Sequence, residues 1–136
     1  MSALVMMGDS EGEYNFTGDE IRADEWFGTT GGYFTVAIHI HNLRGRVYVE
    51  ASLAEEPTEN DWFSIWLTPT TSYVQYPRDL SDPTGSTGDT GVEAYNFEGN
   101  FTWLRTRLDR SYMTPEPESD EAIAAFGVVQ KILLNR

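Results

Sequence analysis

The segment 33–54, YFTVAIHIHNLRGRVYVEASLA, alternates apolar and polar side chains on both sides of a glycine. A repeat of two residues is typical of half-buried β-strands, because successive side chains of a strand point to opposite faces. The Arg44-Gly45 dipeptide offers a tight turn between the two halves. We therefore expect residues 33–54 to form a β-hairpin, with one face built from Phe34, Val36, Ile38, Ile40, Val47, Val49, Ala51 and Leu53.

Further strands are expected along the rest of the chain, because glycine and proline separate short alternating segments. Residues 62–68, WFSIWLT, predict a strand packed on both faces. Further strands are expected at 72–77, ended by Pro77, at 92–97 and 101–112, joined by the turn at 98–100, and at 126–136. The alanines of DEAIAAF, residues 120–126, favour one or two helical turns before the last strand.

Seven or eight strands with short connections and no clear crossover helix predict an all-β fold, an antiparallel β-sandwich or jelly roll. We expect a single domain over residues 1–136, with an irregular N-terminal segment of about 30 residues. The expected core comprises Val36, Ile38, Ile40, Val47, Val49, Phe63, Ile65, Leu67, Leu104, Leu108, Ile132 and Leu134.

Charge narrows the expected partners. Nine basic and 22 acidic residues give a formal net charge of −13, which disfavours nucleic acid and anionic membranes. No apolar run approaches the roughly 18 residues of a membrane span. The start, MSALVMM, lacks the basic and long apolar regions of a signal peptide, so we expect a soluble protein made inside a cell. The absence of cysteine excludes disulfides and thiolate chemistry.

The sequence offers two candidate metal-binding sites. His39 and His41 lie two apart on one strand face and could reach one ion, but a zinc or iron site needs a third ligand. A polar outer face is the simpler explanation. The loop 78–91, RDLSDPTGSTGDTG, could ligate calcium through Asp79, Asp82 and Asp89, although its spacing is not that of an EF-hand.

Catalysis is not expected. The carboxylates Glu55, Glu56, Glu59 and Asp61 share one connection, as a glycosidase pair would, but such a cluster is ordinary in so acidic a chain. No nucleophile elbow, P-loop or dinucleotide fingerprint occurs. We therefore expect no enzymatic activity and no cofactor.

The aromatic residues indicate a binding surface. The tryptophans Trp26, Trp62, Trp66 and Trp103 could stack on sugar rings or anchor a protein interface, and core packing would absorb some of them. Phe101, Trp103, Arg105 and Arg107 share one strand face. Either these arginines, with Arg110, pair with acids of the same chain, or Trp103, Arg105 and Arg107 face a neighbouring subunit.

The segments GRVYVEASLAEEPTENDWFSI (45–65), YVQYP (73–77), YNFEGNFTWLRTRLDRSY (95–112) and GVVQKILLNR (127–136) resemble small β-sandwich virion proteins of tailed bacteriophages, especially cyanobacterial and other marine phages. The resemblance implies a non-enzymatic structural protein of the virion, made in the host cytoplasm and placed at the capsid surface, neck, tail or baseplate. Its partners would be other virion proteins. A looser likeness to carbohydrate-binding sandwiches implies an alternative, a module that recognises host surface glycans.

Self-association is also expected. The apolar N-terminus from Met1 to Met7, which includes Leu4 and Val5, and the apolar C-terminal strand leave more apolar surface than a monomer of this size would expose. Sandwich edges also invite strand addition. We expect a symmetric homo-oligomer, a trimer if the protein decorates a phage particle, with Met1–Met7 or the face of Trp103, Arg105 and Arg107 at the contact.

Overall fold

The alternating segments of the sequence form two antiparallel sheets packed face to face. A computed structural model of the chain describes residues 4–23, 32–78, 88–113 and 117–135. The described strands are β1 (Leu4–Met7), β2 (Phe16–Thr17), β3 (Ile21–Arg22), β4 (Tyr33–Leu43), β5 (Gly45–Ser52), β6 (Phe63–Ser64), β7 (Val74–Tyr76), β8 (Asp89–Glu98), β9 (Trp103–Asp109) and β10 (Val128–Asn135). A 3₁₀ helix, η1 (Glu59–Asp61), and a helix, α1 (Asp120–Ala124), complete them.

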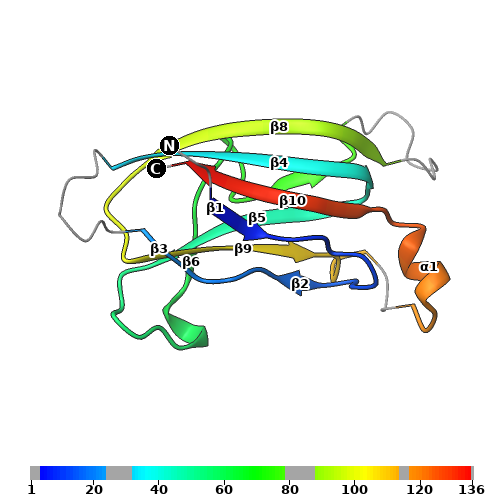
Figure 1. Cartoon of the computed structure of the whole chain (residues 1–136), viewed down its shortest axis with the longest axis horizontal. Coiled ribbons are helices and arrows are strands. Elements are labelled where there is room, and N and C mark those ends of the chain that lie inside the picture. Colours follow the sequence, from blue (N-terminus) through cyan, green and yellow to red (C-terminus); the bar gives the residue numbers. More distant parts are fainter. Residues whose placement is uncertain (1–3, 24–31, 79–87, 114–116, 136) are drawn as a thin grey trace.

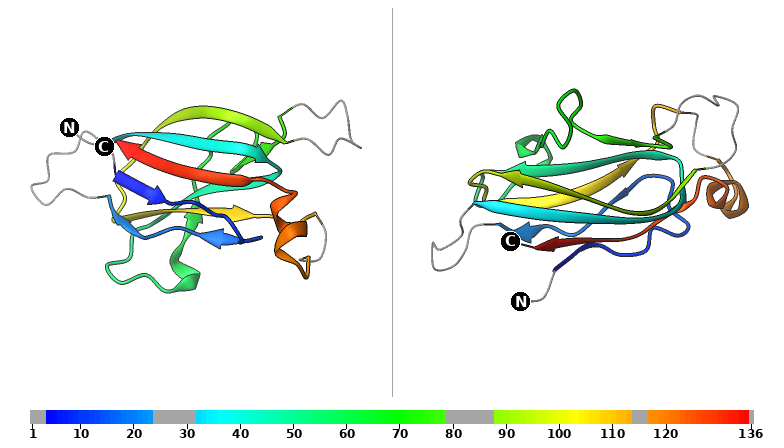
Figure 2. Two further views of the ribbon diagram at one scale, coloured as in Figure 1. Left: turned by 45° about the vertical axis from the view of Figure 1, so that its right-hand side comes forward. Right: turned by 90° about the horizontal axis from the view of Figure 1, so that it is seen from above.

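Sheet A has the strand order β1-β10-β4-β8, and sheet B has the order β2-β9-β5-β6, with β3 pairing with β9 and β7 with β5. Figure 1 shows the four strands of sheet A as the upper layer and β9, β2, β3 and β6 below them. In the view from above in Figure 2, the strands of one sheet overlap those of the other. The predicted all-β sandwich is therefore confirmed, with ten strands in the described residues instead of seven or eight.

The core lies between the sheets and is supplied by alternate residues of each strand. From sheet A it receives Val36, Ile38 and Ile132, and from sheet B Val49 and Leu108, all fully buried. Each such side chain stabilises the fold by about 1.5–3 kcal/mol when it leaves water. The other buried apolar residues include Met6, Met7, Phe34, Ile40, Leu43, Val47, Ala51, Val74, Tyr76, Leu104, Val129 and Leu134.

The predicted hairpin over residues 33–54 is wrong. β4 belongs to sheet A and β5 to sheet B, so the chain crosses from one sheet to the other instead of turning back within one. Asn42 and Gly45 bend the backbone here with φ of 51° and 156°, a region that favours glycine. Because the two strands face the same core from opposite sides, their alternation is the same as in a hairpin.

Two details of the expected core also differ. Residues 62–68 contribute only the two-residue strand β6, because η1 precedes it and the chain bends after Ser64. Ile65 and Leu67 still pack against the core from irregular backbone. Leu53 is exposed because β5 ends at Ser52. Phe63, opposite Ala51, lies on the core side of sheet B next to the ring of Phe101, but at the margin of the sandwich, where it stays 42% exposed.

The N-terminal segment is more regular than expected. β1 pairs with β10, and β2 and β3 pair with β9, so this segment closes one side of both sheets. Met6 and Met7 are buried in the core. The helical turn expected near residue 120 is present as α1, where the Ser119 hydroxyl accepts a hydrogen bond from the Ala122 N–H at 3.1 Å.

Edge strands in the described fold are short, with one exception. The outer strands of sheet B have two or three residues, and β1 at one edge of sheet A has four residues and an irregular register. β10, expected to expose its apolar residues, lies inside sheet A between β1 and β4. β8, at the other edge, is ten residues long and lies at the top margin of Figure 1.

Candidate functional site

Paired charges cover the outer face of sheet B. β5 and β9 pair over seven positions, which places Glu50 opposite Arg105 and Tyr48 opposite Arg107. Because side chains of one parity share a face, the outer face receives Arg46, Tyr48, Glu50 and Ser52 from β5 and Trp103, Arg105, Arg107 and Asp109 from β9.

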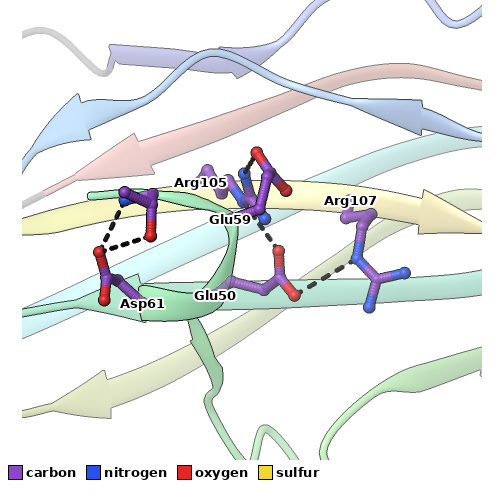
Figure 3. Close-up of polar contacts among 6 residues, drawn as sticks. Glu50, Glu59, Asp61, Arg105 and Arg107 are labelled. Carbon is purple, nitrogen blue, oxygen red and sulfur yellow. Dashed lines mark hydrogen bonds and ion pairs between the residues drawn. The ribbon is translucent and has the colours of Figure 1, made fainter.

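Glu50 lies between two arginines, as Figure 3 shows. Its Oε1 accepts a hydrogen bond from Arg105 Nε at 2.8 Å, and its Oε2 accepts one from Arg107 Nε at 3.3 Å. The side chains of Arg105 and Glu50 are only 8% and 9% exposed. Burial lowers the pKa of Arg105, but hydrogen bonds to Glu50 and Glu59 outweigh burial, so the pKa is raised above its usual value.

Aromatic rings are stacked against these guanidinium groups. Arg105 lies over the ring of Trp62 at 4.2 Å and Arg107 over Tyr48 at 4.3 Å. Arg46 lies 4.3 Å from the ring centre of Tyr73. A ring face covered by a guanidinium group is occupied by a cation–π contact and is not free to stack on a sugar.

Trp103 is also held within the chain. Its Nε1 donates a hydrogen bond to the carbonyl oxygen of Glu55 at 2.9 Å, and Arg22 lies over its ring at 5.1 Å. The three residues expected at an interface, Trp103, Arg105 and Arg107, therefore have partners in the same chain. This arrangement is the alternative in which the arginines pair with the protein's own acids.

The acids of the connection between β5 and β6 have individual local roles. Glu55 forms an exposed ion pair with Arg22 at 2.9 Å, and Glu59 reaches Arg105 at 3.4 Å. Asp61 accepts hydrogen bonds from the backbone N–H and the hydroxyl of Thr58 and so caps η1. Glu56 is exposed. The structure does not bring two of these carboxylates together as a catalytic pair.

The outer face of sheet A has a different composition. Direct strand partners form one row across the sheet: Val5 opposite Leu133, Leu133 opposite Ala37, and Ala37 opposite Ala94. We call these four residues the apolar row. Val5 is 56% exposed, and Val92, on the same face next to the row, is 59% exposed. Tyr33, further along β4 on this face, is 70% exposed.

Polar groups on this face carry little negative charge. His39 lies opposite Lys131 and Val92, and His41 opposite Val128, so both histidines are on the outer face as expected. Glu98, opposite Tyr33, is the carboxylate that β4, β8 and β10 place on this face. Within the described ranges no group of three or more His, Asp or Glu could hold a metal ion.

The other N-terminal interface residues divide between two environments. Met1 lies outside the described residues. Leu4 is half-buried in β1, while Val5 points outward at the end of the apolar row.

A cavity of about 260 Å³ opens between the sheets beside Gly91, and Asp89, Arg78 and Tyr76 line it with Glu93. Of the three aspartates of the expected calcium loop, Asp89 accepts a hydrogen bond from the Arg78 backbone N–H at 2.7 Å, while Asp79 and Asp82 lie outside the described residues.

Two polar atoms near this cavity, Tyr76 Oη and Glu93 Oε1, are buried without a hydrogen bond of regular geometry. Burial and the neighbouring Glu93 carboxylate raise the pKa of Tyr76.

Arg110, which the sequence grouped with Arg105 and Arg107 as a possible partner of the chain's own acids, is buried and binds backbone carbonyl oxygens instead. Its guanidinium group donates hydrogen bonds to the carbonyl oxygens of Arg44, Glu13, Tyr14, Phe126 and Gly127, at 2.7–3.3 Å. Its side chain is fully buried. Burial lowers the pKa of Arg110 to about 10, which leaves the group charged at neutral pH. Arg110 therefore connects three segments of the chain, near residues 13–14, 44 and 126–127, through hydrogen bonds to their backbone.

Comparisons with known proteins identify no relative: no family model matches the chain, and neither the curated proteins nor the solved structures contain a match. No helix in the described part of the chain has the length and apolar character to span a membrane.

Proposed function

We propose that this protein is a non-enzymatic structural subunit of a tailed-phage virion that acts through protein–protein contacts on the outer face of sheet A. The observation that carries the proposal is the apolar row of Val5, Leu133, Ala37 and Ala94 across the outer face of sheet A. An exposed apolar strip with polar residues around it is typical of a protein interaction site.

The distribution of charge supports the same face. The chain carries a net charge of −13, yet its one lysine and both histidines lie on the outer face of sheet A beside the apolar row. A protein partner that approached other acidic surfaces would have to overcome more electrostatic repulsion or carry a complementary positive patch. The resemblance of the strand and turn segments to virion proteins supplies the assignment to a phage particle.

Mass spectrometry of purified particles tests this function. A structural subunit has a fixed copy number per particle that agrees with the symmetry of the capsid, neck, tail or baseplate. Its absence from purified particles, or a copy number that varies between preparations, would contradict the proposal. The chain would be made in the host cytoplasm and then be incorporated into the virion as a subunit.

A second candidate function, recognition of a host surface glycan, is supported by the cavity beside Gly91. Its lining combines hydrogen-bond acceptors on Asp89 and Glu93 with donors on Arg78, and sugar hydroxyl groups need both. The stacked guanidinium groups argue against Trp62 and Trp103 as a sugar platform, while Trp66 is exposed.

A glycan array with the wild type and the Glu93→Gln variant tests this second function. Binding that the substitution weakens would support it. Absence of binding to every glycan on the array would contradict it.

A further inference from the structure

The free edge of β8 is the most open backbone edge in the described fold. Natural sheets protect their edges with short strands, bulges, prolines or lysines. The other described edge strands have two to four residues, and β1 also has an irregular register. β8 has ten residues, DTGVEAYNFE, with neither proline nor lysine, and its register with β4 is regular from Glu98 to Gly91 and shifts only beyond Gly91.

The hydrogen-bonding direction of β8 follows from its register with β4. The Gly99 N–H donates to the Gly32 carbonyl oxygen at 2.9 Å, and the same register continues from Tyr33 opposite Glu98 to Ile40 opposite Gly91. Residues of one parity therefore point their backbone groups at β4, and those of the other parity point away from it. The N–H and C=O groups of Val92, Ala94 and Asn96 are directed to the free edge.

We propose that β8 pairs antiparallel with β8 of a second copy of this chain, about a two-fold axis at Ala94. This inference deepens the proposed function, since it names a partner for the sheet A side of the molecule. The pairing would join two copies of sheet A into one continuous sheet of eight strands, built on the four described in each copy.

The apolar row indicates that the strand that pairs with the β8 edge comes from a second copy of this chain. Ala94 is the last residue of that row, and Ala37 is its direct partner in β4. With Ala94 opposite Ala94 of the second copy, the row of one chain continues into the row of the other, from Val5 to the partner's Val5. A strand of unrelated sequence would satisfy the backbone groups but would not extend the row.

Charge selects the register. With the axis at Ala94, Glu93 lies opposite Tyr95 and Val92 opposite Asn96, so no two carboxylates are direct partners. A shift that centres the pair on Glu93 would place two carboxylates opposite each other, which is destabilising. A shift to Tyr95 would place Ala94 opposite Asn96 and interrupt the apolar row.

Glu93 is the residue that would otherwise protect this edge, because an inward-pointing charge is one of the devices that discourage strand addition. Here Arg78 Nη1 contacts Glu93 Oε2 at 3.0 Å and Tyr95 Oη at 2.8 Å. The charge of Glu93 therefore has a counter-ion within the chain, and the two copies meet without an uncompensated carboxylate at the contact.

The test is the molar mass of the whole chain, measured by light scattering over a range of concentrations. We expect twice the 15.4 kDa of one chain at high concentration. The variant Ala94→Pro lacks the N–H that points away from β4, and the proline ring obstructs strand addition at this edge. This variant should therefore be monomeric. Ala94→Lys leaves the backbone intact and places two ammonium groups opposite each other at the axis, so it should be monomeric as well.

The matched control is Ala37→Lys, which adds the same charge to the same row one strand further from the edge. It should remain a dimer. A monomeric wild type, a trimer, or a dimer that persists in both Ala94 variants would overturn the proposal. Loss of the dimer in Ala37→Lys as well would indicate that two sheet faces stack, which would also overturn pairing through β8. None of these results decides whether the protein is present in a virion.

Discussion

The outer faces of the two sheets differ in how far their side chains are satisfied within one chain. On sheet B, Glu50 is enclosed by Arg105 and Arg107, and each of these arginines covers an aromatic ring. On sheet A, the apolar row and Val92 are open to solvent, and among the described strands none pairs with the outer edge of β8. Both faces come from strands with the same alternation.

This difference separates residues that stabilise the fold from residues that are available to a partner. The aromatic and arginine residues of sheet B are the types found at interface hot spots, yet they are used to stabilise the chain itself. The less conspicuous alanine, valine and leucine residues of sheet A have no such partners on their outer side within the described part of the chain. An interaction surface is therefore better identified by what lacks a partner than by residue type.

The largest expected effect on the free energy of unfolding is that of replacing Arg110, which binds backbone carbonyl oxygens at one end of the sandwich. Arg110→Met would leave several buried carbonyl oxygens without a donor, and we expect a loss of about 3 kcal/mol or more in the free energy of unfolding. Urea denaturation measures it. A loss below about 1 kcal/mol would show that water replaces the guanidinium group and that this end is open.

The next effect tests whether the face of sheet B is satisfied internally. Glu50→Gln would remove the buried carboxylate shared by Arg105 and Arg107. Since Glu59 and Asp109 still lie beside these arginines, we expect a loss of about 1.5–3 kcal/mol in the free energy of unfolding. The control is Glu55→Gln, which removes the exposed partner of Arg22 and should cost less than about 1 kcal/mol. Equal effects of the two substitutions would contradict the comparison.

A smaller effect should appear at acid pH through Asp109 on the same face. Burial raises the pKa of Asp109, but hydrogen bonds from Ser111 and the Arg107 charge outweigh burial and lower it. A carboxyl group with a lowered folded-state pKa stabilises the fold above its unfolded pKa of about 3.9, and this stabilisation is lost as the pH falls through the folded value.

Stability measured from pH 6 to pH 2 should therefore fall less steeply in Asp109→Asn than in the wild type, and the variant should be less stable at pH 6. Parallel curves for the two proteins would rule out this contribution of Asp109.

The smallest expected effect is on the outer face of sheet A. Val92→Thr keeps the shape of an exposed side chain and should change the free energy of unfolding by no more than about 0.5 kcal/mol. Thermal denaturation at low protein concentration measures it. A loss above about 2 kcal/mol would mean that this face is already packed within the monomer.

The sequence predicted the side-chain faces of the fold well and its strand partners poorly. Alternation assigned Ile38, Val49 and Leu108 to the core, and all are buried. It could not reveal that β4 and β5 lie in different sheets, because two strands that face one core from opposite sides alternate as a hairpin does. The short strands β2 and β3 gave no periodic signal because a period needs more than two residues.

The candidate sites were predictable to a similar degree. The shared face of Trp103, Arg105 and Arg107 follows from their spacing, but Glu50, some 55 residues away from Arg105, became their partner only through the register of β5 with β9. The apolar row joins residues of four strands from both ends of the chain, so no local pattern marks it. Arg110 binds carbonyl oxygens, which every sequence provides.

Amide hydrogen exchange of β8, resolved by residue with NMR, tests the central claim most directly. The amides of Glu93 and Tyr95 point at β4 and should be protected at every protein concentration. Those of Val92, Ala94 and Asn96 should exchange quickly in dilute protein and become protected as the concentration rises and the edges pair. Fast exchange of these three amides at all concentrations, with the Glu93 and Tyr95 amides protected, would contradict the claim that sheet A is completed by a second copy.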